Sequence, residues 1–455
     1  MTLSVVILAA GYGKRMYSKL PKVLHQLAGQ PLLLHVIKTA QTLNPDAIYV
    51  VYGNGGSRVR ETLGDLPVNW VNQANPKGTG HAVLQALPHI PDDHQVLILY
   101  GDVPLIKTAT LKQLLADNEQ QFALLVATFD DPTGFGRIIR NPDNEIVAII
   151  EHRDATPDQL LIQEVNTGIL TGPAAAFKRW LPQLKDHNAQ SEYYLTDIIS
   201  LVAENDHKIA GLLAPSLEEV AGVNDRKELM RLERYYQSQK ALELLEQGVT
   251  IIDPSRFDCR GTLNIANDVT LDINVILSGE VAIDEGSYIG PNTLLNNVKI
   301  GKNVIIKSNC VIEDAVIEDG CQIGPFARIR PHTQLGKEVH IGNFVELKNT
   351  KIDDFSKVNH LTYLGDSTLG KRVNVGAGTI TCNYDGINKF ETLIKDGAFI
   401  GSGTELVAPI TIGENAYIGA GSTITRDAPD AQLTLSRAKQ TTINGWSKKK
   451  GESLD

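Results

Sequence analysis

The sequence lacks the features that membrane and secreted proteins need. Only 4 of its 455 residues are cysteines, and none of these forms the close pairs typical of metal sites. Nowhere do 18 apolar residues follow one another, and the short apolar start leads directly into a glycine-rich loop. We therefore expect no membrane insertion, no signal peptide, free thiols and a cytoplasmic location.

Positive charge is also scarce. The 43 Lys and Arg residues face 53 Asp and Glu residues, and the net charge of -10 argues against nucleic acid or an anionic membrane as a partner. The one basic run, Lys448 to Lys450, stands near the end of the chain and is interpreted as a solvated tail. Phosphate groups would therefore have to bind to a local cluster of cations.

Such a cluster occurs near the start of the chain. Residues 3 to 8 are an apolar run typical of a strand buried on both faces of a parallel sheet, and the loop LAAGYGKRM follows at residues 8 to 16. Its two glycines allow the backbone to approach an anion closely, and Arg15 and Lys22 supply positive charge. The pattern predicts a polyphosphate site between a strand and a helix. An ordinary turn with two surface cations is the alternative.

The loop is not the dinucleotide fingerprint, because Met16 stands where the third glycine would be. Further strand-like and helix-like runs alternate along the first half of the chain, which predicts a doubly wound α/β sheet. The strand-like runs are 48–52, 96–100, 124–128 and 209–213, and the helical ones include 32–43 and 108–115. Ligands of such sheets bind at the carboxyl ends of the strands.

Two oxygen-bearing residues stand where a metal could bind. Asp102 follows the apolar run 96–99, and Asn224 lies in the segment GVNDR. Both side chains carry the hard oxygen atoms that Mg²⁺ prefers. A helix or turn cap is the alternative for each. From Asn224 to Gln247 the composition is helical, with Gly248 as its C-terminal cap, which predicts a rigid spacer.

The second half of the chain has a period of six. Aliphatic residues recur at every sixth position from 265 to 295, and the period restarts at 300, 317, 352, 369 and 394 and runs to 424. A small residue often stands four places later, as at Cys310 and Cys321. One inward aliphatic residue per short side is typical of a left-handed parallel β-helix. In some proteins such a repeat serves assembly alone.

Two departures from the repeat favour catalysis. His360 stands at a polar position in the segment NHLTYLGD, and residues 381–390 interrupt the period. A histidine can act as a general base near neutral pH, although a surface role is the alternative. A loop that leaves a regular solenoid can reach a neighbouring subunit. Cys382 in this loop is either a reactive thiol or an inert exposed one.

The segments of the first half together resemble a known family. LAAGYGKRM with LPK resembles the signature loop of sugar-phosphate nucleotidylyltransferases, and YGDVP with GVNDR resembles the Mg²⁺ segments of bacterial N-acetylglucosamine-1-phosphate uridylyltransferases. The resemblance implies that Arg15 and Lys22 act on the triphosphate of UTP, with Mg²⁺ on Asp102 and Asn224. Binding of UTP or the product is implied for Leu8, Ala9, Ala10, Gly11, Lys22, Gln73, Gly78, Thr79, Tyr100, Gly101, Asp102, Gly136, Glu151, Asn166 and Asn224.

Within that set the resemblance implies a further division. Gln73 and the turn at residues 78–81 correspond to the part that reads uracil, whereas Gly136, Glu151 and Asn166 hold the N-acetylglucosamine moiety.

The second half resembles the trimeric hexapeptide acyltransferases, and NHLTYLGD resembles the catalytic segment of glucosamine-1-phosphate acetyltransferases. His360 is then the general base, with Glu346 expected to orient it. The residues implied in binding glucosamine phosphate are Arg330, Lys348, Tyr363, Asn374, Asn383 and Tyr384. Those implied in binding acetyl-CoA are Ala377, Asn383, Tyr384, Ser402, Ala420 and Arg437. The family often has a proline two residues after this arginine, whereas Lys439 stands here.

Over nearly its whole length the chain therefore resembles the bifunctional bacterial enzymes that acetylate glucosamine 1-phosphate and then uridylylate the product. The expected parts are a uridylyltransferase domain (1–226), a linker helix (227–248) and an N-acetyltransferase β-helix with its tail (249–455). The resemblance implies a homotrimer that supplies UDP-N-acetylglucosamine for peptidoglycan and lipid A. A nucleotidylyltransferase with a purely structural repeat and a non-catalytic scaffold are the rival interpretations.

Overall fold

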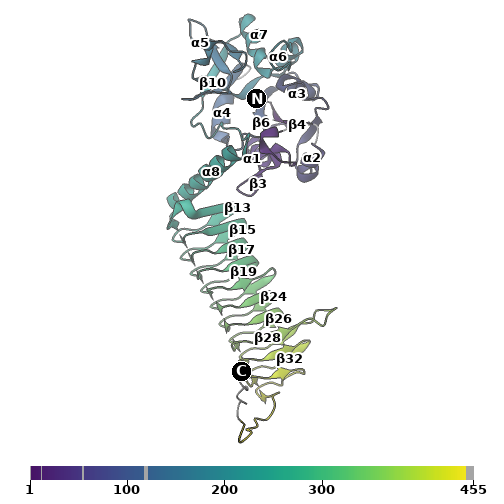
Figure 1. Cartoon of the computed structure of the whole chain (residues 1–455), viewed down its shortest axis with the longest axis vertical. Helices are drawn as coiled ribbons and strands as arrows, with labels where there is room; N and C mark the ends of the chain where they lie inside the picture. Colours follow the sequence, from purple (N-terminus) through teal and green to yellow (C-terminus); the bar gives the residue numbers. More distant parts are fainter. Residues whose placement is uncertain (1, 12, 54–55, 117–120, 447–455) are drawn as a thin grey trace, which may run out of the picture. The chain divides into compact units, whose positions relative to one another are not determined.

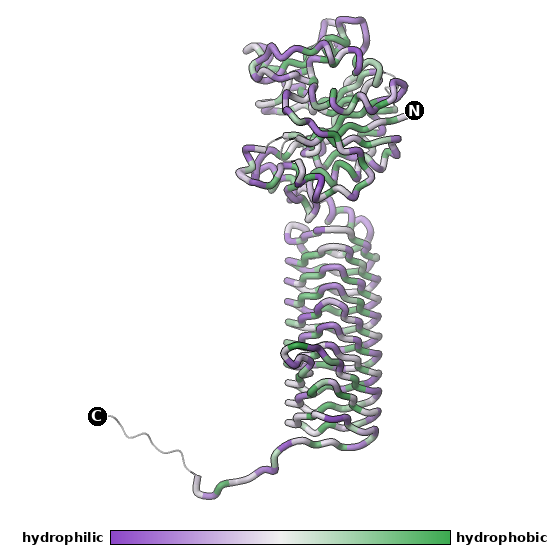
Figure 2. The backbone as a smooth tube through the Cα atoms, turned by 90° about the vertical axis from the view of Figure 1, so that its right-hand side faces the viewer, coloured by the Kyte–Doolittle hydropathy of each residue, from purple (hydrophilic) through white to green (hydrophobic). Residues whose placement is uncertain are grey.

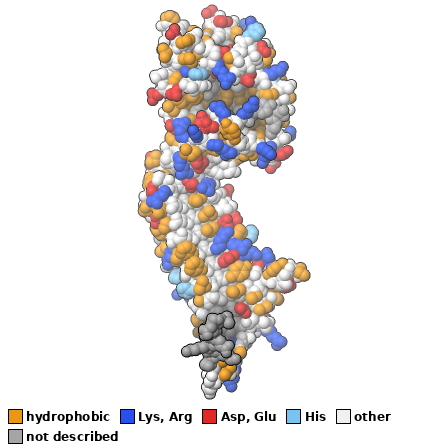
Figure 3. Space-filling model, viewed as in Figure 1, with side chains coloured by type: hydrophobic (Ala, Val, Ile, Leu, Met, Phe, Trp, Pro, Cys, Tyr) orange, Lys and Arg blue, Asp and Glu red, His pale blue; other side chains and the backbone are white. Residues whose placement is uncertain are grey.

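The computed structural model describes residues 2–11, 13–53, 56–116 and 121–446, so Tyr12 of the glycine loop and the Lys448 to Lys450 run lie outside the described residues. Contacts divide the chain into two compact units, Met1–Gln239 and Lys240–Asp455 (Figure 1). On the face shown in Figure 3, basic and acidic side chains are intermixed over both units. Among the described residues, no helix is long and apolar enough to cross a membrane.

The first unit is built on a mixed sheet in the strand order β11-β7-β10-β6-β1-β4-β5, with the β8–β9 hairpin attached to β10. Its strands within the described ranges are β1 (Leu3–Ala9), β4 (Ala47–Tyr52), β5 (Asn69–Asn72), β6 (Gln95–Tyr100), β7 (Phe122–Thr128), β8 (Arg137–Arg140), β9 (Ile146–Ile150), β10 (Glu164–Pro173) and β11 (Ile209–Leu213). The helices are α1 (Leu32–Gln41), α2 (Ser57–Leu63), α3 (Thr79–Ala86), α4 (Thr108–Ala116), α5 (Pro157–Leu160), α6 (Ala174–Trp180) and α7 (Ile198–Glu204).

Strand β1 is buried on both faces, as its apolar run predicts. Because successive side chains of a strand point to opposite faces, Val6 and Leu8 pack with α3, α6 and α7, whereas Val5 and Ile7 pack with α1, α2 and α4. The strand pairs in parallel with β4 and β6, so the carboxyl ends of all three meet at one edge. The predicted doubly wound α/β arrangement is confirmed.

Strand β10 runs antiparallel between β6 and β7, so the sheet is mixed. One local prediction was wrong. The glycine loop does not lead into an α-helix but into a single 3-10 turn, Lys14–Met16, and the first α-helix begins only at Leu32. Gly13 and Tyr17 flank this turn in the left-handed conformation, with φ of 57° and 49°, which stops a helix from forming.

Helix α8 (Arg226–Glu246) follows the first sheet, close to the predicted range, and the division between the two units falls within it. In its first half Leu232 is buried against Met16 and Leu27 of the first unit. In its second half Ala241 and Leu244 belong to the core of the second unit, while Leu242 and Leu245 are exposed. Gly248 ends this segment with a φ of +89°, as expected of a C-terminal cap.

The second unit is a parallel β-helix whose coils stack strand on strand (Figure 1). One face, called here the short-strand sheet, consists of β12 (Thr250–Ile251), β14 (Thr270–Leu271), β16 (Tyr288–Ile289), β18 (Ile305–Ile306), β20 (Gln322–Ile323), β23 (His340–Asn343), β25 (Lys357–His360), β27 (Asn374–Val375), β30 (Phe399–Ile400), β33 (Tyr417–Ile418) and β35 (Leu433–Thr434).

The remaining strands form a second sheet that bends around a corner, called here the long-strand sheet. Its members are β13 (Phe257–Ile265), β15 (Val275–Ile283), β17 (Leu294–Ile300), β19 (Val311–Ile317), β21 (Arg328–Ile329), β22 (Thr333–Leu335), β24 (Glu346–Ile352), β26 (Tyr363–Leu369), β28 (Ile380–Cys382), β29 (Thr392–Ile394), β31 (Glu405–Val407), β32 (Ile410–Ile412) and β34 (Thr423–Ile424).

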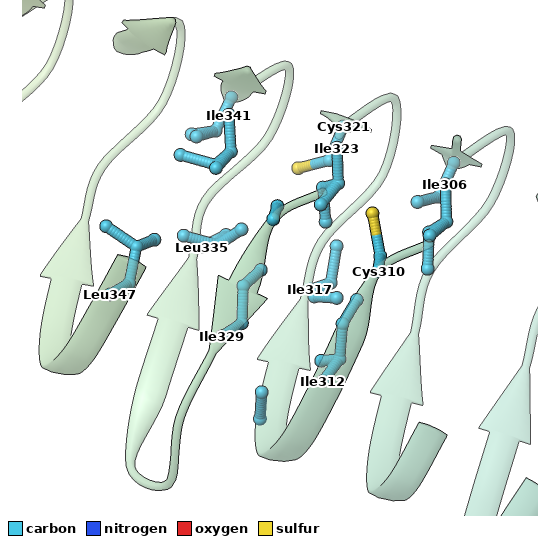
Figure 4. Close-up of a cluster of buried hydrophobic side chains, with 14 of the residues drawn as sticks. Ile306, Cys310, Ile312, Ile317, Cys321, Ile323, Ile329, Leu335, Ile341 and Leu347 are labelled. Carbon is cyan, nitrogen blue, oxygen red and sulfur yellow. The ribbon is translucent and has the colours of Figure 1, made fainter. Parts of the chain in front are cut away.

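The aliphatic residues of the six-residue period form the core of the coils. In Figure 4 the side chains of Ile306, Ile323 and Ile341 point inward from successive coils, and all three are at most 1% exposed. Cys310 and Cys321 fill the small positions between them, and all four cysteines of the chain are free thiols. Figure 2 shows the resulting alternation of hydrophobic and hydrophilic segments along each coil.

Where the six-residue period restarts, one corner of the coil is one residue shorter than in the preceding coil. Strand β15 pairs with β17 as Ser278 with Asn296 and then as Val281 with Val298, so the second coil omits one residue at the bend. Asn297 makes this tighter bend with a φ of 52°, a conformation that asparagine tolerates better than most residues.

Candidate active sites

The first site is a cavity of about 340 Å³ at the carboxyl ends of β1 and β6. Ten of the residues predicted to bind nucleotide line it: Leu8, Ala9, Ala10, Gly11, Lys22, Gln73, Gly78, Thr79, Tyr100 and Asp102. Val23, Pro76, Ala82 and Glu192 complete the lining. Gly101 adjoins the cavity, since its N–H donates to the carbonyl of Leu8 at 2.9 Å. Arg15, which lies on the exposed 3-10 turn, is not part of the lining.

Three side chains meet at one edge of this cavity. The Lys22 ammonium forms an ion pair with the Asp102 carboxylate and donates to Asn224 Oδ1 at 3.2 Å. The backbone keeps the two oxygen-bearing residues together, because the N–H of Val223 donates to the carbonyl of Asp102 at 2.8 Å. One carboxylate and one amide oxygen thus already converge on a single cation.

The donor set fits Mg²⁺. This ion takes hard oxygen ligands and usually few of them from the protein, leaving the remainder to water and phosphate. Within the described ranges no group of three or more His, Cys, Asp or Glu side chains could hold a metal, so a site with only two protein ligands is the relevant possibility. The Asp102 and Asn224 oxygens meet that requirement once Lys22 moves away.

Gln73 lines the cavity with a carboxamide that is only 2% exposed. Its Nε2 lies 3.2 Å from the carbonyl oxygen of Gly78 and 2.9 Å from Nδ1 of His81. Gly78 has a φ of +107° and an added Cβ would meet Tyr193 backbone atoms, so only glycine fits there. Burial, together with the charge of Lys77, lowers the pKa of His81 and favours its neutral form.

The residues predicted to hold the sugar form a second group that Tyr100 links to the cavity. The N–H of Asn166 donates to the Gly136 carbonyl at 2.9 Å, and a Cβ on Gly136 would lie 3.5 Å from the Glu151 carboxyl. Burial raises the pKa of Glu151, and burial followed by the charges of Glu151 and Asp102 raises the pKa of Tyr100. The three predicted residues are thus neighbours.

Sequence reasoning missed two residues of this group. The Thr196 hydroxyl donates to Glu151 Oε1 at 3.0 Å and is 6% exposed. Burial, then Glu151 and Asp154, raises the pKa of Asp197 to about 6. Both stand in a 3-10 turn, Leu195–Asp197, that has no recognisable motif, so only the fold shows that they approach Glu151.

The second unit carries a charged cluster on its long-strand sheet. Arg330 Nη1 donates to Glu346 at 2.8 Å, Lys348 lies 4.0 Å from the Asp366 carboxylate, and Asn383 Nδ2 donates to Asp366 at 2.5 Å. Three of the predicted sugar-phosphate residues therefore contact the carboxylates of Glu346 and Asp366, which balance the positive charges of Arg330 and Lys348.

Lys389 belongs to the same cluster, although no motif pointed to it. A hydrogen-bond contact with Lys389, followed by burial, lowers the pKa of Lys348. The extruded loop brings it there: Tyr384 and Lys389 form an antiparallel bridge, and the loop projects from the coils beside β28 (Figure 1). Two lysines and an arginine so close together favour an anion such as phosphate.

Tyr363 and Asn383 lie over Gly365. A Cβ at that position would be 2.3 Å from the Tyr363 hydroxyl and 2.8 Å from Asn383 Nδ2. The glycine therefore lets two predicted sugar-binding side chains approach the strand closely. Tyr384 is 60% exposed and donates only to Gly386 of its own loop, at 2.5 Å.

His360 lies on the short-strand sheet, at the end of β25, and its ring partner is not the predicted one. Nδ1 lies 2.9 Å from Oδ1 of Asn343, which pairs with His360 in the β23–β25 register, whereas Glu346 is occupied by Arg330. The expectation that Glu346 orients His360 is therefore corrected. Because an amide oxygen only accepts, Nδ1 carries a proton, and in the neutral ring Nε2 is then the nitrogen with the lone pair.

Four of the six predicted acetyl-CoA residues, all but Asn383 and Tyr384, lie in one column on the coils that follow His360. The N–H of Gly378 donates to His360 O at 3.2 Å, that of Gly403 to Ala377 O at 2.7 Å, and that of Gly421 to Ser402 O at 2.8 Å. Arg437 Nη1 continues the column by donating to the carbonyl of Ala420 at 2.9 Å. Residues far apart in the sequence are thus stacked coil on coil.

At the corner of the coils beside this column, the side chains change near His360 from large and apolar to glycine. Phe326, Phe344 and Leu361 occupy it above, with φ of 55°, 56° and 46° and side chains 49%, 54% and 63% exposed. Gly378, Gly403 and Gly421 take the same corner below, with φ of 71°, 66° and 68°. An added Cβ on Gly403 would find its nearest neighbour 3.9 Å away, so the glycines leave open space along the column.

Asn374 is the predicted sugar residue that stands apart. It lies on β27 of the short-strand sheet, paired with Lys357 and Phe399, whereas Arg330 and Lys348 belong to the long-strand sheet.

Models of known protein families match parts of both units. The model of the MobA-like NTP transferase domain matches residues 5–207, and that of the bacterial transferase hexapeptide repeats matches residues 314–349 and 391–426. A solved nucleotidyl transferase from Methanothermobacter thermautotroptrophicus aligns with 52% of this chain and 97% of its own, at 18% identity, with a TM-score of only 0.38.

Relatives match the whole chain. Bifunctional protein GlmU of Legionella pneumophila (strain Paris) is 53% identical over 452 residues, which are 98% of each chain. Bifunctional protein GlmU of Coxiella burnetii (strain RSA 493 / Nine Mile phase I) is 56% identical over 448 residues, again 98% of each chain. With relatives more than half identical along nearly its entire length, the chain belongs to the GlmU family of bifunctional proteins.

Proposed function

We propose that this chain makes UDP-N-acetylglucosamine in two steps, one at each site. The second unit acetylates glucosamine 1-phosphate with acetyl-CoA, and the first unit transfers UMP from UTP to the resulting N-acetylglucosamine 1-phosphate. The observation that supports this most strongly is that ten of the fifteen residues predicted to bind nucleotide line one cavity and four of the six predicted acetyl-CoA residues lie in one column.

In the acetyl transfer, His360 Nε2 takes a proton from the sugar nitrogen as that nitrogen attacks the thioester carbonyl. The carbon–sulfur bond then breaks, and the sulfur of CoA leaves as a thiol with the proton that His360 returns. Asn343 holds the ring with Nε2 free, and Arg330, Lys348 and Lys389 hold the phosphate of the sugar. Acetyl-CoA lies along the corner formed by Gly378, Gly403 and Gly421, called here the glycine corner. It contacts Ala377, Ser402, Ala420 and Arg437, with Asn383 and Tyr384 nearby.

In the uridylyl transfer, an oxygen of the sugar phosphate attacks the α-phosphorus of UTP and the bond to the bridging oxygen of pyrophosphate breaks. No side chain acts as a nucleophile, so catalysis consists of alignment and charge neutralisation. Lys22 leaves Asp102 and, with Arg15, binds the triphosphate. Asp102 and Asn224 would hold Mg²⁺, which would supply positive charge beside the phosphates. Gln73, Gly78 and Thr79 bind uridine, and Gly136, Glu151 and Asn166 bind the sugar.

The proposal includes the organisation of the chain. Residues 1–226 act as the uridylyltransferase, 227–248 as a linker and 249–455 as the acetyltransferase. Three copies associate through the β-helix in the cytoplasm, without nucleic acid or membrane. Two features support association: Phe326, Phe344 and Leu361 are apolar yet exposed, and the protruding loop at 383–390 extends beyond its own coils.

The test is to incubate the protein with glucosamine 1-phosphate, acetyl-CoA, UTP and Mg²⁺ while following free thiol and pyrophosphate together. The proposal expects both products, with pyrophosphate dependent on acetyl-CoA. Pyrophosphate release only from added N-acetylglucosamine 1-phosphate, without any thiol, would show that the β-helix serves assembly alone.

A further inference from the structure

Gln73 is held through both its backbone and its side chain. Its backbone N–H donates to the carbonyl of Tyr52 at 2.8 Å, and its Nε2 lies within hydrogen-bond distance of both Gly78 O and His81 Nδ1. Among the described residues, no donor reaches its Oε1. Two contacts at the nitrogen end fix the orientation of this buried carboxamide.

The chemistry of the partners fixes which end is engaged. The carbonyl oxygen of Gly78 can only accept, so the nitrogen of the carboxamide must face it. The carbonyl is itself held in place, because the turn is bonded to the next segment: Tyr193 N donates to Lys77 O and Gly80 N donates to Tyr193 O, both at 2.8 Å. The carboxamide oxygen is then left for a ligand.

His81 must accept the second hydrogen of that nitrogen. A proton on Nδ1 would set two donors against each other at 2.9 Å, so Nδ1 is unprotonated and the proton of the neutral ring is on Nε2. Gln85 contacts the other ring nitrogen: its Nε2 lies 3.3 Å from Nε2 of His81 and donates to the backbone carbonyl of His81 at 3.2 Å. The contact of Gln73 with Nδ1 is the shorter one, at 2.9 Å, so Nδ1 is the acceptor. His81 therefore completes the fixation of Gln73.

We propose that His81 is a positioning residue that makes the carboxamide of Gln73 present only its oxygen to the base, and so selects uracil over cytosine. This inference rests on the proposed uridylyl transfer at the first site. Uracil carries a hydrogen on N3, which the oxygen accepts. Cytosine has a lone pair there, which the oxygen repels. Thymine carries the same N3 hydrogen, so this device does not distinguish it.

The test compares two substitutions of His81. His81→Asn places an acceptor oxygen near the position of Nδ1, whereas His81→Leu has a similar shape and no acceptor. The measurement is the ratio of kcat/KM for UTP to that for CTP, with N-acetylglucosamine 1-phosphate saturating. We expect His81→Leu to lower this ratio about tenfold, the effect of one hydrogen bond, and His81→Asn to keep it near the wild-type value.

Other readouts separate positioning from loss of structure. For His81→Leu the KM for UTP should rise while kcat changes little, and thiol release by the second unit should equal that of the wild type. A loss of UTP and CTP turnover in equal proportion, or an unchanged ratio, would overturn the proposal. In the wild type itself, UTP methylated at N3 should lose at least tenfold in kcat/KM, and equal use of both nucleotides would also overturn it.

An error in the proposed function and an error in the role of His81 would give different results. If the wild type releases no pyrophosphate from UTP, the proposed function is wrong. If it does so with UTP strongly preferred over CTP, and His81→Leu keeps that preference, only the role of His81 is wrong.

Discussion

The two sites of this chain are assembled in opposite ways. In the first unit Lys22 contacts Asn224 across 202 residues, and each group arrives on a different loop at the edge of a sheet. In the second unit His360 contacts Asn343 across 17 residues, the length of one coil, and the acetyl-CoA column likewise connects residues of neighbouring coils. The comparison teaches that a repeat can place a site by register alone, whereas an α/β sheet must bring distant loops together.

The strongest way to separate the two regions is to remove Asp102. Asp102→Ala takes away the carboxylate that would hold Mg²⁺ against the phosphates in the proposed uridylyl transfer, and we expect pyrophosphate release to fall by about a thousandfold or more. Thiol release should stay within about twofold, because none of its residues lies in the first unit. The exposed Asp143→Ala is the matched control and should change neither activity. Substantial pyrophosphate release by Asp102→Ala in saturating Mg²⁺ would contradict the assignment.

The reciprocal substitution is His360→Ala. Loss of a general base lowers a rate by about a hundredfold to ten-thousandfold, so thiol release should fall by that factor while pyrophosphate release from added N-acetylglucosamine 1-phosphate is kept. Both activities are measured on one preparation. Joint loss of both would mean unfolding rather than loss of a base.

The glycine corner gives a third test, because the same corner accepts phenylalanine elsewhere. Phe326 and Phe344 adopt a φ of 55° and 56°, so Gly403→Phe is compatible with the coil but fills the open space beside Ala377. We expect the KM for acetyl-CoA to rise by about tenfold or more, as several contacts of the ligand are lost. Thermal unfolding should be nearly unchanged. Phe344→Gly, on the other side of His360, is the control, and an equal rise in its KM would contradict the account.

The smallest effect concerns the orientation of His360. Asn343→Ala removes one hydrogen bond to Nδ1, which should lower kcat for acetyl transfer about tenfold and leave the KM for acetyl-CoA unchanged. Asn343→Asp should instead move the acid limb of the pH profile to higher pH, because a carboxylate favours the charged form of the ring. An unchanged kcat in Asn343→Ala would show that packing alone orients the ring.

The same contrast explains what the sequence could predict. The period of six predicted the buried residues of the coils, including Ile323 and Cys321, because each coil has the same inward positions. Ala377 and Ser402, by contrast, were predicted only from the family resemblance, because the extruded loop interrupts the period between them. The ring partner of His360 could have been found by counting 17 residues back along the coil, although the motif suggested Glu346.

The first unit was less predictable because its contacts cross between elements. Apolar runs identified β1 and β6, but the antiparallel β10 depends on its neighbours in the sheet and not on its own sequence. The missing helix after the glycine loop reflects the left-handed conformations of Gly13 and Tyr17, which no propensity of Lys14 to Met16 indicates. Thr196 approaches Glu151 only through the fold.

The central claim is that the chain carries two independent sites joined by a diffusible intermediate, and mixing two inactive variants tests it most directly. Asp102→Ala and His360→Ala are each unable to convert glucosamine 1-phosphate, acetyl-CoA and UTP into UDP-N-acetylglucosamine. The account predicts that an equal mixture restores conversion, with thiol appearing before pyrophosphate. A mixture that stays as inactive as either variant, while each keeps its remaining activity, would contradict it.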